Sequence, residues 1–142
     1  MVYPPQPGEG LDGIVGEYYP EITIRSEGKM VEKNYPFTLT NKKCIERILA
    51  DDNVAINHMV LPKGEGLPEH YSDSHVYMIV VRGQITLKLN EEEANSHPAG
   101  SILNIPYKTK MNVYNAGEEV TELFVVKAPS PKTMRSRENK GS

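Results

Sequence analysis

The fold is decided by the stretch GEGLPEHYSDSHVYMIVVRG, residues 64–83. Its second half, Val76 to Arg82, is apolar at every position before the terminal arginine, which is typical of a β-strand covered on both faces. Gly83 follows, and residues 84–89 then alternate between polar and apolar side chains, the period of a strand with one wet face. We therefore expect two strands joined by a tight turn, in which glycine adopts a backbone conformation that other residues avoid.

Further short strands are expected on both sides of this stretch, at residues 21–25, 44–50, 54–61, 101–105, 111–114 and 120–127. Turn residues separate them and helical periodicity is almost absent, a pattern that predicts an antiparallel sandwich or barrel. A chain of 142 residues fits one domain of ordinary size. We expect an extended N-terminal arm at 1–20, a β-barrel at 21–128 and a flexible basic tail at 129–142.

The charge distribution argues against a nucleic-acid surface. The chain carries a net charge of −3, while residues 132–142 hold four basic residues and one acidic residue, so the remainder of the chain carries −6. Nucleic-acid binding needs a basic stripe on the folded body. The first residues, MVYPPQP, lack the charged and apolar regions of a secretory signal. We therefore expect a cytoplasmic protein with neither a nucleic-acid nor a membrane partner.

Two stretches together resemble the signature motifs of the cupin superfamily: residues 64–83 and GSILNIPYKTKMNVYN, residues 100–115. The positions in register are Gly64, His70 and Gly83 in the first motif, and Gly100, Pro106 and Asn115 in the second. The resemblance covers about residues 54–128. It implies an all-β fold, the antiparallel double-stranded β-helix or jelly-roll barrel, and the proline and glycine residues of 1–20 add the extended N-terminal arm.

The residues at the family's metal-ligand positions differ from the pattern. In the family, two histidines and a glutamate of the first motif and a histidine of the second hold a divalent metal. Only His70 matches, because Ser72, Val76 and Met111 occupy the other three positions; Lys108 stands at the second-motif glycine. We expect no tightly held metal and no cofactor. The alternative is a divalent metal in a rearranged site built on His70, His75 and Glu69.

A cupin barrel without metal still offers a cavity at its mouth. The resemblance places these residues on its lining: His70, Ser72, Val76, Met78, Met111 and Val113. We expect a small organic ligand there, a sugar or an organic acid, with His70 as the candidate acid or base. Whether the chain is an enzyme stays open. The alternatives are a metal-dependent dioxygenase, isomerase or decarboxylase on His70 and His75, and a structural or regulatory barrel.

Three further expectations concern side-chain orientation and assembly. His75 should point away from the pocket if Val76 points into it, since neighbouring residues on a strand face opposite sides. Cys44, the single cysteine, is interpreted as a small buried apolar residue without a base partner. Tyr77, Ile79 and Val81 should form a second apolar face, which an N-terminal arm and a second copy would cover, so we expect a homodimer.

Overall fold

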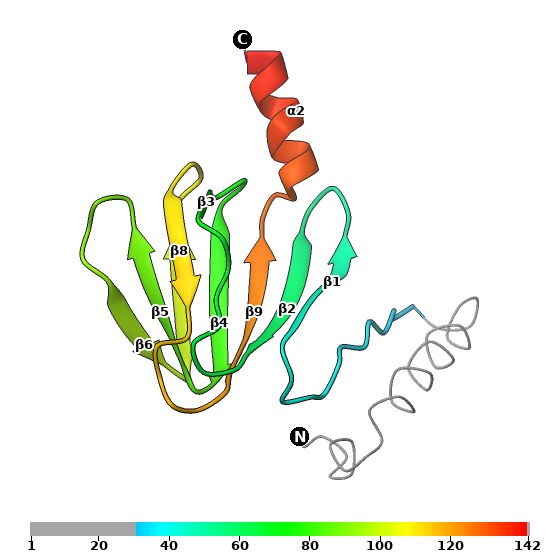
Figure 1. Cartoon of the computed structure of the whole chain (residues 1–142). Coiled ribbons are helices and arrows are strands. Elements are labelled where there is room, and N and C mark those ends of the chain that lie inside the picture. Colours follow the sequence, from blue (N-terminus) through cyan, green and yellow to red (C-terminus); the bar gives the residue numbers. More distant parts are fainter. Residues whose placement is uncertain (1–30, 142) are drawn as a thin grey trace.

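The computed structural model describes residues 31–141, which form two facing antiparallel sheets (Figure 1). The larger sheet has the strand order β1-β2-β9-β4-β7 and the smaller one β3-β8-β5-β6. The bounds are β1 Cys44–Ala50, β2 Ala55–Leu61, β3 His70–Tyr71, β4 Val76–Arg82, β5 Gln84–Leu89, β6 Asn95–Pro98, β7 Ser101–Ile105, β8 Lys110–Tyr114 and β9 Thr121–Lys127.

The order of the strands confirms the double-stranded β-helix. The chain passes from β4 to β5 and from β7 to β8, and each step crosses from one sheet to the other. The expected strands from residue 44 onward are present within one residue of their predicted ends. The short strands β3 and β6 were not predicted, because neither has the apolar alternation that marks a strand in sequence. The expected arm at 1–20 and strand at 21–25 lie outside the described residues.

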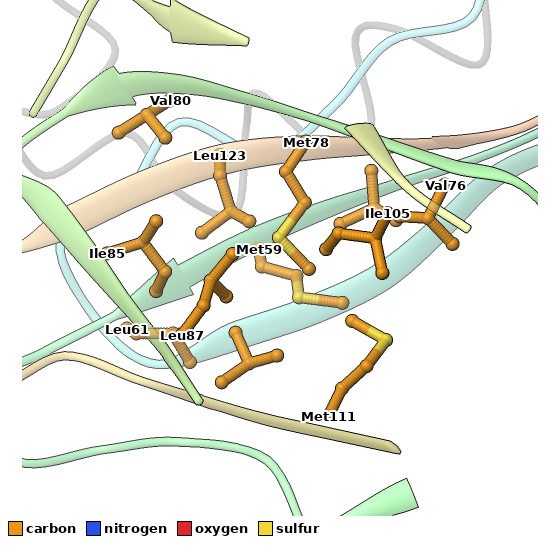
Figure 2. Close-up of a cluster of buried hydrophobic side chains, with 12 residues drawn as sticks. Met59, Leu61, Val76, Met78, Val80, Ile85, Leu87, Ile105, Met111 and Leu123 are labelled. Atoms are coloured by element: carbon orange, nitrogen blue, oxygen red, sulfur yellow. The ribbon is translucent and has the colours of Figure 1, made fainter. Parts of the chain in front are cut away.

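The core fills the space between the two inner faces (Figure 2). Val76, Met78 and Val80 of β4 are each at most 2% exposed, whereas Tyr77 and Val81 are 40% exposed. This alternation confirms that residues 76–82 have two apolar faces. The residues of the core cluster are Met59, Leu61, Val76, Met78, Val80, Ile85, Leu87, Ile105, Met111, Val113, Leu123 and Val125.

The motif positions act as turn and anchor points. Gly83, between β4 and β5, has a φ of +68°, and a Cβ atom there would lie 2.4 Å from the Val120 carbonyl oxygen. A residue with a side chain is therefore disfavoured here for two reasons: the positive φ, and the lack of room for a Cβ atom. Asn115 is buried, and its Nδ2 donates to the carbonyls of Leu61 and Glu119 at 2.9 and 2.8 Å, which ties three chain segments together.

The C-terminal segment differs from the expected flexible tail, because Pro131–Gly141 forms the helix α2 (Figure 1). Proline is well suited to the first turn of a helix, where its missing N–H has no partner to lose. Met134 is only 7% exposed, and Thr133 Oγ1 donates to the Asp52 carbonyl at 2.7 Å. Tertiary contacts of this kind stabilise a helix whose sequence has little helical signal. Among residues 31–141, no helix has the length and apolar character needed to cross a bilayer.

Lys108 provides a test of the second motif. It stands at the motif's glycine position and adopts a φ of +66°, a conformation that costs a residue with a Cβ atom. Lys108→Gly and Lys108→Ala both remove the ion pair with Glu138 and differ only in that Cβ atom. We expect the glycine variant to be more stable by about 1 kcal/mol, measured by urea unfolding. If the two variants had the same free energy of unfolding, or if the alanine variant had the higher one, the positive φ at residue 108 would carry no energetic cost.

The homodimer stays a prediction, and the outer face of the larger sheet supplies its test. Ile102 pairs with Ile79 on that face and is 68% exposed. We expect light scattering at micromolar concentration to give twice the 15.9 kDa chain mass, and Ile102→Lys to reduce it towards that of a monomer. Ile45→Lys is the control, because Ile45 is 49% exposed but pairs with Met59 on the inner face. A monomeric unsubstituted chain would exclude the dimer.

Candidate functional site

The positions that hold metal in the resembled family do not form a metal site here. His70 is an exposed residue of the short strand β3, and its Nδ1 donates to the Pro68 carbonyl at 2.9 Å. The hydroxyl of Ser72 is already engaged, because it donates to the Pro106 carbonyl at 2.6 Å and accepts from the Thr109 N–H. Val76 and Met111 belong to the packed core. One imidazole beside apolar side chains does not fit a divalent ion.

The rearranged site is not assembled in the described part of the chain either. His75 is exposed while Val76 is 2% exposed, so His75 points away from the barrel interior as expected. Its ring lies 6.3 Å from that of Tyr107, measured between centroids. Within residues 31–141, Glu69, His70 and His75 do not bring ligand atoms together as a group of three.

Four of the residues that were expected to line a pocket are part of the packed core. Val76, Met78, Met111 and Val113 are each at most 2% exposed, and the Met78 and Met111 side chains lie among the other apolar groups between the sheets (Figure 2). The interior of this barrel is therefore occupied by its own side chains at the positions where the family resemblance implied a ligand. This agrees with the general use of methionine to fill irregular core space.

The helix α2 approaches the ends of β1, β2 and β9 (Figure 1). Residues of these elements line a cleft of about 350 Å³. Asn57 pairs with the core residue Val125, and Arg47 pairs with Asn57, so the sheet side chains of the cleft continue the inner face. The full lining is Arg47, Ala50, Asp51, Ala55, Asn57, Asp73, Lys127, Ser130, Pro131, Lys132 and Arg135. Sequence reasoning missed the cleft because α2, which supplies part of it, was not predicted.

Cations outnumber carboxylates on the cleft lining, by four to two. Lys127 is neutralised by Asp73 at 3.0 Å. Lys132 contacts Asp52 at 3.4 Å, but both side chains are more than three-quarters exposed, and such a pair is weak. Arg47 and Arg135 have no hydrogen-bond or ion-pair partner within the described range 31–141. As far as the described residues go, the cleft therefore presents two guanidinium groups without a carboxylate partner.

The opposite face of the larger sheet holds a second polar cluster, centred on His58. The His58 side chain is fully buried, with Nδ1 2.8 Å from Glu46 Oε2 and Nε2 2.6 Å from Glu122 Oε2. Arg82 Nε donates to the other oxygen of Glu122 at 2.8 Å. The rings of Phe37 and Phe124 lie 4.8 and 4.9 Å from the His58 ring and exclude water from it.

Both carboxylates in this cluster are held ionised. Burial acts to raise the pKa of Glu122, but hydrogen bonds from His58 and Arg82 outweigh it and bring that pKa below its usual value. Burial likewise opposes ionisation of Glu46, whose pKa is nevertheless lowered by hydrogen bonds from the Thr38 N–H and from His58. Each ring nitrogen of His58 therefore faces a carboxylate oxygen, and the Arg82 guanidinium adds a positive charge beside Glu122.

Cys44 belongs to the same cluster, which corrects its interpretation as an isolated apolar residue. Ligand atoms of Cys44, Glu46 and His58 all lie within 4.8 Å of one another. Cys44 and Glu46 are two residues apart on β1, and Glu46 pairs directly with His58 of β2. The alternation of Cys44 and Glu46 was visible in the sequence, but nothing in the sequence placed His58 or Glu122 beside them.

Known proteins resemble the chain in both sequence and fold. An uncharacterized protein of Methanocaldococcus jannaschii is 40% identical over 111 residues, which cover 78% of this chain and 96% of the relative. A crystal structure from that organism, described as an RmlC-like cupin family protein with a double-stranded β-helix fold, is 40% identical with a TM-score of 0.73, covering 75% of this chain and 98% of that chain.

More distant structures share the fold alone. The cupin domain of Schizosaccharomyces pombe Cnp3 is 17% identical with a TM-score of 0.60, covering 79% of this chain and 74% of that one. A cupin superfamily protein of Desulfitobacterium hafniense is 11% identical with a TM-score of 0.55, covering 69% and 83% respectively. No protein-family model matches the chain.

Glu122 tests the energetic weight of the His58 cluster. Glu122→Ala leaves a buried imidazole and a guanidinium without their shared carboxylate, and we expect it to lower the free energy of unfolding by about 3 kcal/mol. The control is Glu118→Ala, which removes the exposed ion pair with Lys63 and should have little effect. Urea unfolding at neutral pH measures both, and equal effects of the two variants would contradict a special role for the buried pair.

Proposed function

Because the chain belongs to the RmlC-like cupin family, we propose that it is a cupin barrel that binds a small organic acid or acidic sugar in the cleft beside α2. No divalent metal is required at the family's metal position. The single observation that carries the proposal is the pair of guanidinium groups, Arg47 and Arg135, which line that cleft without a partner among residues 31–141.

The chemistry of the lining supports an anionic ligand. A guanidinium group presents donors in a planar fork that matches a carboxylate, and it is always charged. Asn57 adds a neutral amide that can donate to or accept from a hydroxyl group. Excess positive charge in a concave surface also concentrates anions there. An organic acid fits these groups better than a neutral or cationic molecule does.

The size of the cleft limits the ligand. A volume of about 350 Å³ lies at the lower end of the range for small-molecule sites, roughly 300–1,000 Å³. The apolar contribution is small, since it comes from Ala50, Ala55 and Pro131. A compact, strongly polar ligand therefore fits better than a large aromatic one.

The proposal contains no catalytic step. His70, the candidate acid or base, is not on the cleft lining, and its ring Nδ1–H is bound to the Pro68 carbonyl. Its catalytic role stays a prediction. The carboxylates of the cleft also have other partners, since Asp51 accepts from the N–H groups of Asn53 and Val54 and Asp73 pairs with Lys127.

Calorimetric titration of the full chain at low salt with citrate, malate, glucuronate and glucose tests the proposal. We expect at least one of the acids to bind and glucose not to bind. Arg47→Ala and Arg135→Ala should each weaken binding about tenfold, equivalent to roughly 1.4 kcal/mol, because each removes a charge-assisted hydrogen bond.

Arg137→Ala is the matched control, since Arg137 is an exposed arginine of the same helix that does not line the cleft. It should leave the affinity unchanged. Binding that is equally strong for glucose and glucuronate, or insensitive to both cleft arginines, would refute the site. Failure of all three acids to bind at millimolar concentration would refute the proposed ligand class.

A further inference from the structure

We propose that Cys44, Glu46 and His58 form a zinc-binding site on the outer face of the larger sheet, separate from both the cleft and the family's metal position. Thiolate sulfur, imidazole nitrogen and carboxylate oxygen are the three donor types that zinc takes in proteins. Here one of each converges from two paired strands, β1 and β2. Within residues 31–141, this is the group of three ligand side chains that is close enough to share an ion.

The separations suit a tetrahedral ion. Zinc lies about 2.3 Å from sulfur and about 2.0 Å from nitrogen or oxygen, so two of its ligands are roughly 3–4 Å apart. The ligand atoms of the cluster lie within 4.8 Å of one another, and the Nδ1 of His58 is 2.8 Å from Glu46 Oε2. Small side-chain rotations close this triangle around an ion, and the fourth position stays open for water.

The groups around the ligands orient them as they do at known zinc sites. A metal-bound histidine usually donates its other ring N–H to a carboxylate, which fixes the tautomer. Nε2 of His58 lies 2.6 Å from Glu122 Oε2, so this bond leaves Nδ1 facing Glu46. Glu122 is held in turn by Arg82 at 2.8 Å. The cluster therefore includes both the proposed ligands and the hydrogen bonds through Glu122 and Arg82 that orient His58.

Glu46 is also positioned from its outer side. Thr38 Oγ1 donates to Oε1 at 2.9 Å and the Thr38 N–H donates to Oε2 at 2.8 Å, which orients the carboxylate so that Oε2 faces the ring of His58. The Phe37 and Phe124 rings pack on His58 and give the site an apolar wall, which strengthens electrostatic attraction to an ion. Cys44 and Glu46 are only partly buried, so an ion can enter from their side.

Zinc binding displaces the proton of the Cys44 thiol to solvent. Without metal, burial and the nearby Glu46 carboxylate raise the pKa of this thiol, which therefore carries its proton. The ion replaces that proton by a bond to sulfur, and a bond from Nδ1 of His58 to the ion replaces the contact of Nδ1 with Glu46 Oε2.

Cobalt(II) provides a direct readout, because a thiolate bound to it gives a near-ultraviolet charge-transfer band. The chain has one cysteine, so such a band can arise only from Cys44. We expect the chelator-treated full-length chain to show this band on adding one equivalent of cobalt(II), and zinc to abolish it by displacement. Zinc should also protect Cys44 from a thiol-specific reagent in the same preparation.

Variants separate this site from the alternatives. Cys44→Ser should remove the band and lower zinc affinity at least tenfold, whereas Glu122→Gln should keep the band and lower zinc affinity ten- to a hundredfold. His75→Ala, which removes an exposed histidine outside the cluster, should change neither. Circular dichroism confirms that each variant is folded, and thiol protection in the unsubstituted chain gives a result even where a variant unfolds.

Absence of the band together with absence of thiol protection would overturn the site and leave the cluster as an ion-pair network alone. Zinc binding that survives in Cys44→Ser but is lost in His75→Ala would assign the ion to surface histidines, and would equally overturn it. Either result leaves the proposed cleft ligand untouched, because the cleft contains none of the three residues.

Discussion

Opposite orientation of neighbouring side chains on β2 and β9 is the constraint on which the rest of the structure depends. Met59 points into the core between the sheets while His58, next to it, points to the outer face. Leu123 and Glu122 repeat the same division on the paired strand. One sheet therefore seals an apolar interior with one face and encloses a charged network with the other, and a shift of one residue in register would exchange the two.

The interior combines the cupin fold with apolar side chains at two of the positions where the family places metal ligands. The turn positions Gly83 and Gly100 have positive φ angles and Asn115 anchors its loop, whereas Val76 and Met111 replace ligands with apolar side chains. Burial of these side chains stabilises the barrel by removing apolar surface from water. Polar side chains gather outside this core, in the cleft against α2 and around His58 on the outer face of the larger sheet.

The two faces of the larger sheet differ in charge balance, and this separates their proposed roles. The cleft has more cations than carboxylates and contains two arginines without partners in the described chain, which suits an anion from solution. The His58 cluster matches two carboxylates with an imidazole and a guanidinium and adds a thiol. The thiol, the imidazole and one carboxylate are the three donor types on which the zinc proposal rests.

The sequence by itself determined the barrel, because local turn chemistry at Gly83, strand alternation at residues 76–89 and the interval between the two motifs are all properties of nearby residues. It also identified the loss of the family's ligands, position by position. Tertiary structure alone decided the rest. His58 and Glu122 are 64 positions apart, and α2 is stabilised by contacts to Asp52, 81 positions from Thr133. No local pattern encodes such pairings, since they arise only when strands distant in sequence become neighbours in a sheet.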